Sequence, residues 1–279
     1  MPFVSTWFEF PSPFKTAPGS VLLADPPVSN IRQLRAMLLD ETYPKPFVID
    51  DGDLLTLYFN IRLIQSAMRL NSPDTLELRY TQTMMSFLLF NPHPERIVQI
   101  GLGGGSLAKF CFQRLPGSRV TVLEINPDVI AFRDIFKLPP DGQRFKLLQR
   151  DGAEFLTRAK SNIDVLLIDA FDQTGFASEL ASREFFETVF DKLSNAGQLV
   201  MNLAGDKRRY RGLLDEVSEV FDHRMVTVPV CGDGNTVLMA VKNANCKTSG
   251  RRLENHAVAL KKQYGLPFPD YLEKIARAI

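Results

Sequence analysis

The stretch from Arg96 to Glu124, which reads RIVQIGLGGGSLAKFCFQRLPGSRVTVLE, constrains the fold more than any other part of the chain. It has the pattern of a short apolar strand, a turn rich in glycine, a helix and a second strand. Glycine lets the backbone approach a ligand closely and lets the helix pack tightly on the strand before it. The stretch therefore predicts one strand–turn–helix–strand unit of a nucleotide- or nucleoside-binding sheet.

Two features of this unit concern the ligand. Its turn contains Gly101, Gly103, Gly104 and Gly105. This glycine spacing also occurs in ordinary turns, but the strands on both sides of the unit favour a ligand-binding turn here. Glu124 ends the second strand, where a carboxylate can accept hydrogen bonds from both hydroxyls of a ribose. The pattern indicates an adenosine-containing ligand and leaves open whether that is a dinucleotide or S-adenosylmethionine.

Composition limits the classes of protein to which the chain can belong. Its 279 residues, 45% of them hydrophobic, suffice for one large domain with a smaller appendage. A net charge of +1 argues against a general nucleic-acid binder. The uncharged apolar runs are too short to cross a bilayer, and no export signal opens the chain. We therefore expect a cytoplasmic protein without nucleic-acid or membrane partners.

The three cysteines, Cys111, Cys231 and Cys246, lie far apart and belong to no CxxC or Cys/His cluster. This pattern favours reduced cysteines that serve in packing. No metal site is predicted.

The region before the glycine unit predicts a small β-rich part over residues 1–90. Its first forty residues are rich in proline and are interpreted as an irregular lead-in. Residues 47–60 have the alternation of a β-hairpin that turns at Asp51-Gly52, and residues 62–68 and 76–79 continue the β-rich pattern. Residues 80–90 then have the apolar content of a buried helix.

Residues 91–279 alternate between strands and helices and form the predicted catalytic domain. Strands are expected at 97–100, 119–125, 145–148, 163–168, 198–203, 225–230 and 236–241. Helices are expected at 106–114, 127–136, 153–160, 183–193, 210–221 and from about 253 onward. This order predicts an α/β fold with a doubly wound, Rossmann-like sheet of the class I methyltransferase type, closed by an antiparallel pair of strands.

Parallel sheets of this kind bind ligands outside the carboxyl ends of their strands. Four loops meet at that edge in the predicted sheet. They carry the glycine turn, Glu124, Asp151 and the pair Asp169 and Asp172. The sequence thus predicts one crevice with glycine-rich and acidic walls.

These elements, in this order, resemble the spermidine synthase (polyamine aminopropyltransferase) family from about Leu57 to Leu203. The matching residues are Gln65, Tyr80, the glycine turn, Glu124 in VLEINPDV, the segment DGAEFL that begins with Asp151 and Gly152, and Asp169 and Asp172 in LLIDAFD. The resemblance implies that Glu124 accepts the ribose hydroxyls and Asp151 the adenine amino group. Gln65, Gly101, Gly103, Gly104, Gly105 and Gly152 complete the implied donor site.

For catalysis, the resemblance implies that Asp169 and Asp172 hold and deprotonate the attacking amine, with Tyr80 lending its hydroxyl. An alkylammonium has a pKa near ~10 and no lone pair, so its attack on the carbon beside a sulfonium needs a base and an orienting anion. The implied enzyme moves an aminopropyl group from decarboxylated S-adenosylmethionine, or a related group from S-adenosylmethionine, to a small-molecule amine. It needs no metal, and we expect a homodimer or a higher homo-oligomer.

Two positions depart from the family pattern. The family's glycine turn carries an aspartate that binds the amino group of the donor, and Gly104 stands at that position here. The family's Tyr-His-Glu is Tyr80-Thr81-Gln82. Each change removes a charge-assisted hydrogen bond of roughly 1.5–3 kcal/mol. The sequence therefore leaves the donor open between the two forms, and it predicts that Gly104→Asp improves binding of the decarboxylated one.

Two other functions remain open at this point. One is a methyltransferase on the same fold, and the other is a nucleoside-binding or scaffold protein without catalysis. The missing acid at Gly104 favours the scaffold, and the retained pair of Asp169 and Asp172 argues against it. A structural alternative for that pair itself is helix capping and loop hydrogen bonds. The acceptor amine is not specified by the sequence.

Overall fold

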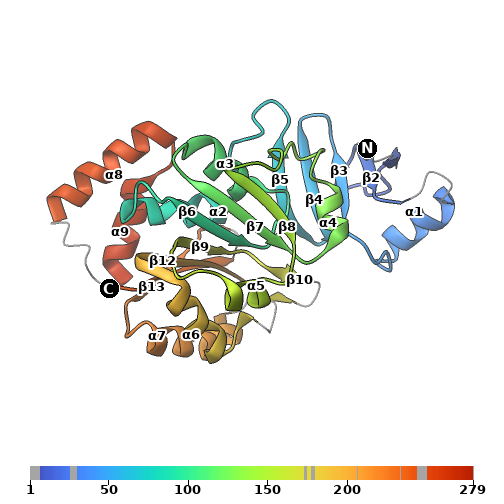
Figure 1. Ribbon diagram of the computed structural model, residues 1–279. Helices are drawn as coiled ribbons and strands as arrows, with labels where there is room; N and C mark the ends of the chain where they lie inside the picture. The colour runs from blue at the N-terminus through green and yellow to red at the C-terminus, as the bar shows by residue number, and fades with distance from the viewer. Residues whose placement is uncertain are drawn as a thin grey trace.

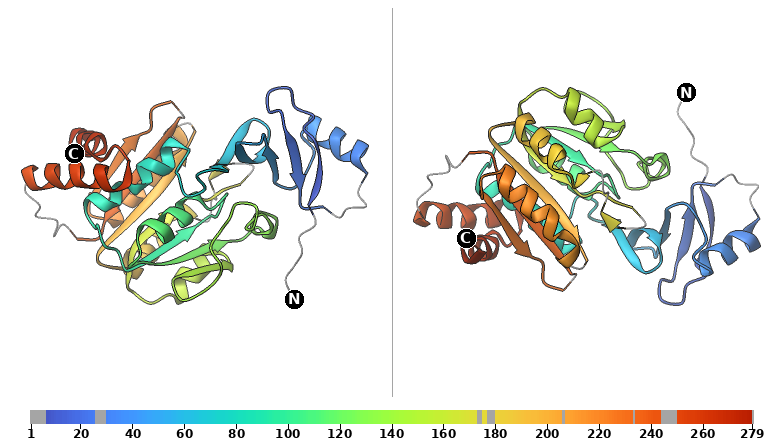
Figure 2. Two further views of the ribbon diagram at one scale, coloured as in Figure 1. Left: turned by 90° about the horizontal axis from the view of Figure 1, so that it is seen from above. Right: turned by 90° about the horizontal axis from the view of Figure 1, so that it is seen from below.

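The computed structural model describes residues 7–25, 30–172, 175–176, 180–205, 207–232, 234–243 and 250–278, with backbone alone for 171–172, 175–176 and Lys207. The described chain contains a five-stranded sheet, a seven-stranded sheet and a two-stranded ribbon formed by β10 (Phe171–Asp172) and β11 (Gly175–Phe176). Figure 1 shows the five-stranded sheet beside the seven-stranded one. In Figure 2 it lies at the opposite end of the molecule from the C-terminal helices.

The five-stranded sheet is antiparallel and follows the order of the chain. Its strands are β1 (Phe8–Pro11), β2 (Ser20–Leu23), β3 (Phe47–Asp50), β4 (Leu54–Asn60) and β5 (Leu63–Arg69). The predicted hairpin at Asp51-Gly52 is confirmed: it joins β3 to β4, and Gly52 has a φ of +93°. Residues 76–79 are not a strand, so that prediction was wrong; Leu76 instead packs in the core of the large sheet.

The irregular lead-in was also a wrong prediction. β1 and β2 form a hairpin, and helix α1 (Ile31–Leu39) follows, capped by Asn30, whose Oδ1 accepts from the backbone N–H of Arg32 and Gln33. Pro11 ends the edge strand β1, a position that needs no ladder donor. Buried apolar side chains from β1 and β2 pack with those of β3, which offsets the local effect of the prolines.

The large sheet has the strand order β13-β14-β12-β9-β6-β7-β8. The parallel strands are β6 (Arg96–Ile100), β7 (Arg119–Glu124), β8 (Phe145–Gln149), β9 (Ile163–Ile168) and β12 (Leu193–Ala204). β13 (Met225–Pro229) and β14 (Asn235–Val241) close one side as antiparallel strands. The predicted Rossmann-like sheet with its antiparallel closure is confirmed. β9 lies at the centre with Val165–Ile168 fully buried, as expected of an apolar strand covered on both faces.

Helices cover both faces of this sheet. α3 (Ser106–Arg114), α8 (Gly250–Tyr264) and α9 (Phe268–Ala278) share one apolar core, and α5 (Gly152–Arg158), α6 (Arg183–Lys192) and α7 (Arg211–Val220) share the other. The short helix α4 (Pro127–Ala131) follows β7, and η3 (Lys207–Tyr210) precedes α7. α4 is shorter than the predicted 127–136: turns replace the helix after Phe132, and Phe132 and Phe136 pack against the five-stranded sheet.

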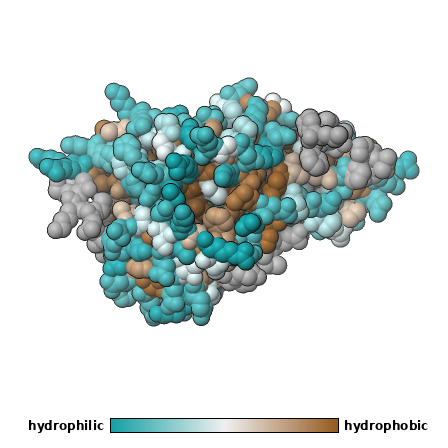
Figure 3. All heavy atoms as spheres, viewed as in Figure 1, coloured by the Kyte–Doolittle hydropathy of each residue, from teal (hydrophilic) through white to brown (hydrophobic). Residues whose placement is uncertain are grey.

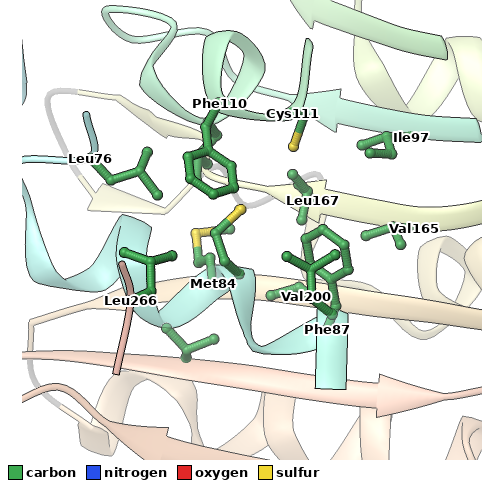
Figure 4. Packing of buried hydrophobic residues seen from close by; sticks show 14 of the residues in the cluster. Leu76, Met84, Phe87, Ile97, Phe110, Cys111, Val165, Leu167, Val200 and Leu266 are labelled. Atoms are coloured by element: carbon green, nitrogen blue, oxygen red, sulfur yellow. The ribbon is translucent and has the colours of Figure 1, made fainter. Parts of the chain in front are cut away.

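α2 (Arg79–Met84) and η1 (Met85–Leu89) lie before the predicted domain boundary at residue 90 and pack in the core of the large sheet. In Figure 4, Met84 and Phe87 lie among Phe110, Leu167 and Val200. This packing fixes the position of Tyr80 on α2, next to the loop after β9. Among the described helices, none is long and apolar enough to span a membrane.

Candidate active site

A cleft of about 1000 Å³ lies at the carboxyl ends of the parallel strands, between the two sheets. Residues from β4, β5 and the turn between them line one side, and the loops after β6, β7, β8, β9 and β12 line the other. Of the residues predicted for the site, the cleft is lined by Gln65, Tyr80, Gly101, Gly103, Glu124, Asp151, Gly152 and Asp169. Gly104 and Gly105 are not among the lining residues. The side chain of Asp172 lies outside the described part of the structure.

Gly101 allows the glycine turn to lie directly against the loop after β9. Its φ is +88°, and a Cβ built there would be 2.2 Å from the backbone carbonyl oxygen of Asp169. The Asp169 N–H in turn donates to the Ile100 carbonyl over 2.9 Å. Glycine at this position therefore brings the predicted nucleoside cradle next to the predicted catalytic carboxylate.

The Glu124 carboxylate is buried at the end of β7 and holds the backbone on both sides of it. Oε2 accepts from the Leu102 N–H and Oε1 from the Asn126 N–H, each over 2.8 Å. Burial raises the pKa of this carboxyl group, and the backbone hydrogen bonds lower it in part. The Ile125 N–H adds a third backbone hydrogen bond to this carboxylate, and the lone pair that remains can accept from a ligand hydroxyl.

Asp151 caps helix α5, with Oδ1 accepting from the Glu154 N–H over 2.7 Å. No described group donates to its Oδ2, which leaves that oxygen for a ligand donor. Gly152 begins the helix, and a Cβ there would be 2.6 Å from the Ile100 side chain. The absence of a side chain at 152 thus lets α5 pack close to β6.

A chain of polar side chains is centred on Asp169. Its Oδ2 accepts from the Tyr80 hydroxyl over 3.1 Å, and its Oδ1 accepts from the Asn202 amide over 2.9 Å. Asn235 donates to Asn202 Oδ1 over 3.0 Å and so fixes the orientation of that amide. Burial raises the pKa of Asp169 to about 6, and the hydrogen bonds from Asn202 and Tyr80 oppose the rise. A carboxyl group with a pKa in this range can exchange a proton close to neutral pH, as a general base must.

Asn202 and Asn235 were missed by the sequence analysis. Asn202 is 2% exposed and lies in the apolar run of β12, and Asn235 begins β14. An asparagine inside a run that otherwise reads as a buried strand was the available signal, because a buried amide requires a partner.

The mouth of the cleft is apolar, which was also missed. Leu63 and Ile64 on β5 are 62% and 52% exposed, and Ile125 after β7 is 64% exposed. Large aliphatic side chains that are clustered in one cleft and more than half exposed to water indicate a surface that a ligand covers. Figure 3 shows apolar atoms gathered in the middle of the face it presents, surrounded by hydrophilic ones.

Gly104 faces away from the cleft, toward packed side chains. A Cβ at this position would be 2.7 Å from Ser66 Oγ and 2.8 Å from the ring of Phe136, which is 1% exposed. The backbone here leaves no room for the aspartate that the family pattern has at this position. Gly105, with a φ of +71°, is enclosed in the same way by Leu138.

No cluster of three or more His, Cys, Asp or Glu side chains that could hold a metal ion occurs among the described residues. Cys111 is fully buried, which raises the pKa of its thiol to about 12, whereas Cys231 is exposed. Cys246 lies outside the described residues.

Comparison with known proteins identifies the family. The model of the spermine/spermidine synthase domain matches residues 77–248. A polyamine aminopropyltransferase of Chromobacterium violaceum is 34% identical over 84% of this chain and 90% of its own length. Two solved structures share the fold. A probable spermidine synthase from Corynebacterium glutamicum matches with a TM-score of 0.64 and 22% sequence identity, over 80% of this chain and 86% of its own. A spermidine synthase in complex with the transition-state analogue AdoDATO matches with a TM-score of 0.58 and 16% identity, over 95% of this chain and 97% of its own. The chain belongs to the spermine/spermidine synthase family.

Proposed function

We propose that this protein is a polyamine aminopropyltransferase, which moves the aminopropyl group of decarboxylated S-adenosylmethionine to a small-molecule amine. The observation that carries the proposal is the contact between two halves of one cleft. Asp169, with its hydrogen bonds from Tyr80 and Asn202, lies directly against the glycine turn of the nucleoside cradle. The names of the relatives support the same activity.

The donor occupies the half of the cleft that is lined by the loops after β6, β7 and β8. Glu124 accepts the ribose hydroxyls, and the free oxygen of Asp151 accepts the adenine amino group. Leu63, Ile64 and Ile125 cover the apolar parts of the nucleoside and lose their exposure to water when it binds. These contacts exclude water from the sulfonium and orient the carbon under attack.

Asp169 and Tyr80 receive the acceptor. The amine arrives as an ammonium, which the ionised Asp169 attracts, and Asp169 takes up the proton that must leave before attack. The nitrogen lone pair then forms a bond to the methylene carbon beside the sulfonium. The carbon–sulfur bond breaks with its electron pair going to sulfur, which leaves the neutral thioether methylthioadenosine.

A methyltransferase is the second candidate, because the glycine turn lacks the carboxylate that the family uses for the donor's amino group. Ser66 and Phe136 fill the space that an aspartate side chain at this position would need. Without that anion in the glycine turn, the carboxylate of ordinary S-adenosylmethionine meets less electrostatic repulsion from the protein. The homo-oligomeric state and the cytoplasmic location remain predictions from the sequence.

Product analysis tests the proposal. The purified protein is incubated with a diamine and either decarboxylated or ordinary S-adenosylmethionine, and the nucleoside products are identified by mass spectrometry. We expect methylthioadenosine with the decarboxylated donor, and its loss in Asp169→Asn. Formation of S-adenosylhomocysteine from the ordinary donor would instead establish methyl transfer. Nucleoside binding without either product would refute both activities.

A further inference from the structure

A second pocket, with a volume of about 420 Å³, lies at the other end of the parallel strands from the cleft. Its lining residues are Arg119, Val120 and Thr121 at the start of β7, Gln143 and Arg144 just before β8, and Lys146 in β8. The strands separate it from the cleft, whose residues follow their carboxyl ends. The proposed transferase reaction makes no use of it.

Positive charge is concentrated in this pocket. Arg119, Arg144 and Lys146 contribute three cations, and no carboxylate is among the lining residues. In the described part of the chain, none of the three forms a salt bridge. The whole chain has 33 basic and 32 acidic residues, so such a local excess is not a consequence of overall composition. Bringing like charges together without an anion is unfavourable, and a bound anion would offset that cost.

Arg144 is held in place by the end of helix α3. Its Nη2 donates to the Phe112 carbonyl over 2.6 Å, its Nε donates to the Ser118 carbonyl over 3.3 Å, and its Cζ lies 4.6 Å from the centre of the Phe112 ring. Its Nη1 makes no hydrogen bond to a described residue. The guanidinium is therefore ordered before any ligand arrives, which reduces the entropy lost on binding.

We propose that this pocket binds a small phosphate-bearing anion. The Arg119 guanidinium can match phosphate oxygens through paired N–H donors, Arg144 offers the N–H groups of its Nη1, and Lys146 adds a compact charge. The Thr121 hydroxyl and the Gln143 amide supply neutral donors in the same lining. A pocket of this volume suits a small molecule such as pyrophosphate or a sugar phosphate. A long nucleic acid would need an extended basic surface, which a chain of net charge +1 does not favour.

The experiment is a calorimetric titration with inorganic pyrophosphate, in the presence of saturating methylthioadenosine so that the cleft is occupied. Arg119→Ser/Lys146→Ser removes the two exposed cations, whose side chains form no hydrogen bond or salt bridge with a described residue. Lys261→Ser/Lys262→Ser, at the exposed end of α8, removes the same charge elsewhere. We expect saturable binding that is roughly 10- to 100-fold weaker in the first variant and unchanged in the second.

Circular dichroism and the Tm establish that both variants are folded. Absence of saturable binding to the parent protein, or equal weakening in the two variants, would overturn the site. Titrations with glucose 6-phosphate, citrate and a single-stranded oligonucleotide define the class of ligand. We expect glucose 6-phosphate to bind, and its affinity to fall in Arg119→Ser/Lys146→Ser. Citrate that binds as tightly as pyrophosphate, or a single-stranded oligonucleotide that competes with it at lower concentration, would overturn the assignment to small phosphates.

Discussion

At the level of single residues, burial is the largest of the effects that act on the Asp169 carboxyl group, and it raises the pKa of that group to about 6. Hydrogen bonds from Asn202 and Tyr80 stabilise the ionised form and oppose the shift. The folded state holds this proton more tightly than the unfolded chain does. The contribution of Asp169 to stability is therefore complete below pH ~4 and is lost as the pH rises through about 6.

The same pKa predicts the pH dependence of turnover. We expect kcat/KM to fall as the pH drops through about 6, because protonated Asp169 neither attracts an ammonium nor accepts its proton. Asn202→Ala removes a hydrogen bond that favours the carboxylate, so the acid limb of the profile should move to higher pH. Asn195→Ala, at an exposed position of the same strand, is the matched control. An acid limb unmoved in Asn202→Ala would remove Asn202 from the control of the Asp169 pKa.

Glu124 is predicted to carry much of the nucleoside affinity. Glu124→Ala should weaken methylthioadenosine binding by about 1.5–3 kcal/mol, roughly 10- to 100-fold, because hydrogen bonds to a charged acceptor are lost. Calorimetry measures the affinity, with Glu154→Ala on the exposed side of α5 as the control. Glu124 also holds the N–H of Leu102, so the Tm must be followed in parallel. Equal affinities in the parent and Glu124→Ala would exclude a ribose contact.

At the level of elements, local patterns predicted the large sheet and the β3–β4 hairpin well, but they missed the first two strands. The strand β6, the glycine turn and α3 follow from residues close in the chain. β1 pairs with β2, and β2 pairs with β3, about 25 residues further along the chain; a sequence dense in proline conceals these pairings. The surroundings of Gly104 were equally hidden, because Ser66 and Phe136 come from distant parts of the chain. The acidic residues that line the cleft could be predicted because each follows the end of a predicted strand. The hydrogen bond between Asn202 and Asn235 could not, because it depends on the antiparallel pairing of β12 with β14.

This packing reverses the expectation for Gly104→Asp. The new side chain would meet Phe136 and Ser66, so we expect a loss of about 1–3 kcal/mol in the free energy of unfolding and no gain in affinity for the decarboxylated donor. Urea denaturation measures the first quantity and calorimetry the second. Gly117→Asp, where no atom lies within 4 Å of the added Cβ, should be close to neutral. A stable Gly104→Asp protein with tighter binding of that donor would restore the interpretation made from the sequence.

At the level of the whole molecule, the cleft exists because the two sheets meet. The five-stranded sheet contributes Leu63 and Ile64, the large sheet contributes Ile125, and neither sheet alone encloses the space between them. The three side chains remain exposed to water in the free protein. Their exposure is unfavourable in the free state and becomes a source of affinity once a ligand covers them.

Leu63→Ser tests this use of the N-terminal sheet. Leu63 is 62% exposed in the free protein, so its loss should leave the Tm nearly unchanged. Covering a leucine side chain contributes roughly 1–2 kcal/mol, so methylthioadenosine should bind about 5- to 30-fold more weakly to the variant. The matched control is Leu39→Ser on α1, which is 52% exposed and outside the cleft, and which should alter neither quantity. If both variants bind the nucleoside like the parent, the apolar mouth takes no part in holding the donor; if both bind it more weakly, the effect does not arise in the cleft.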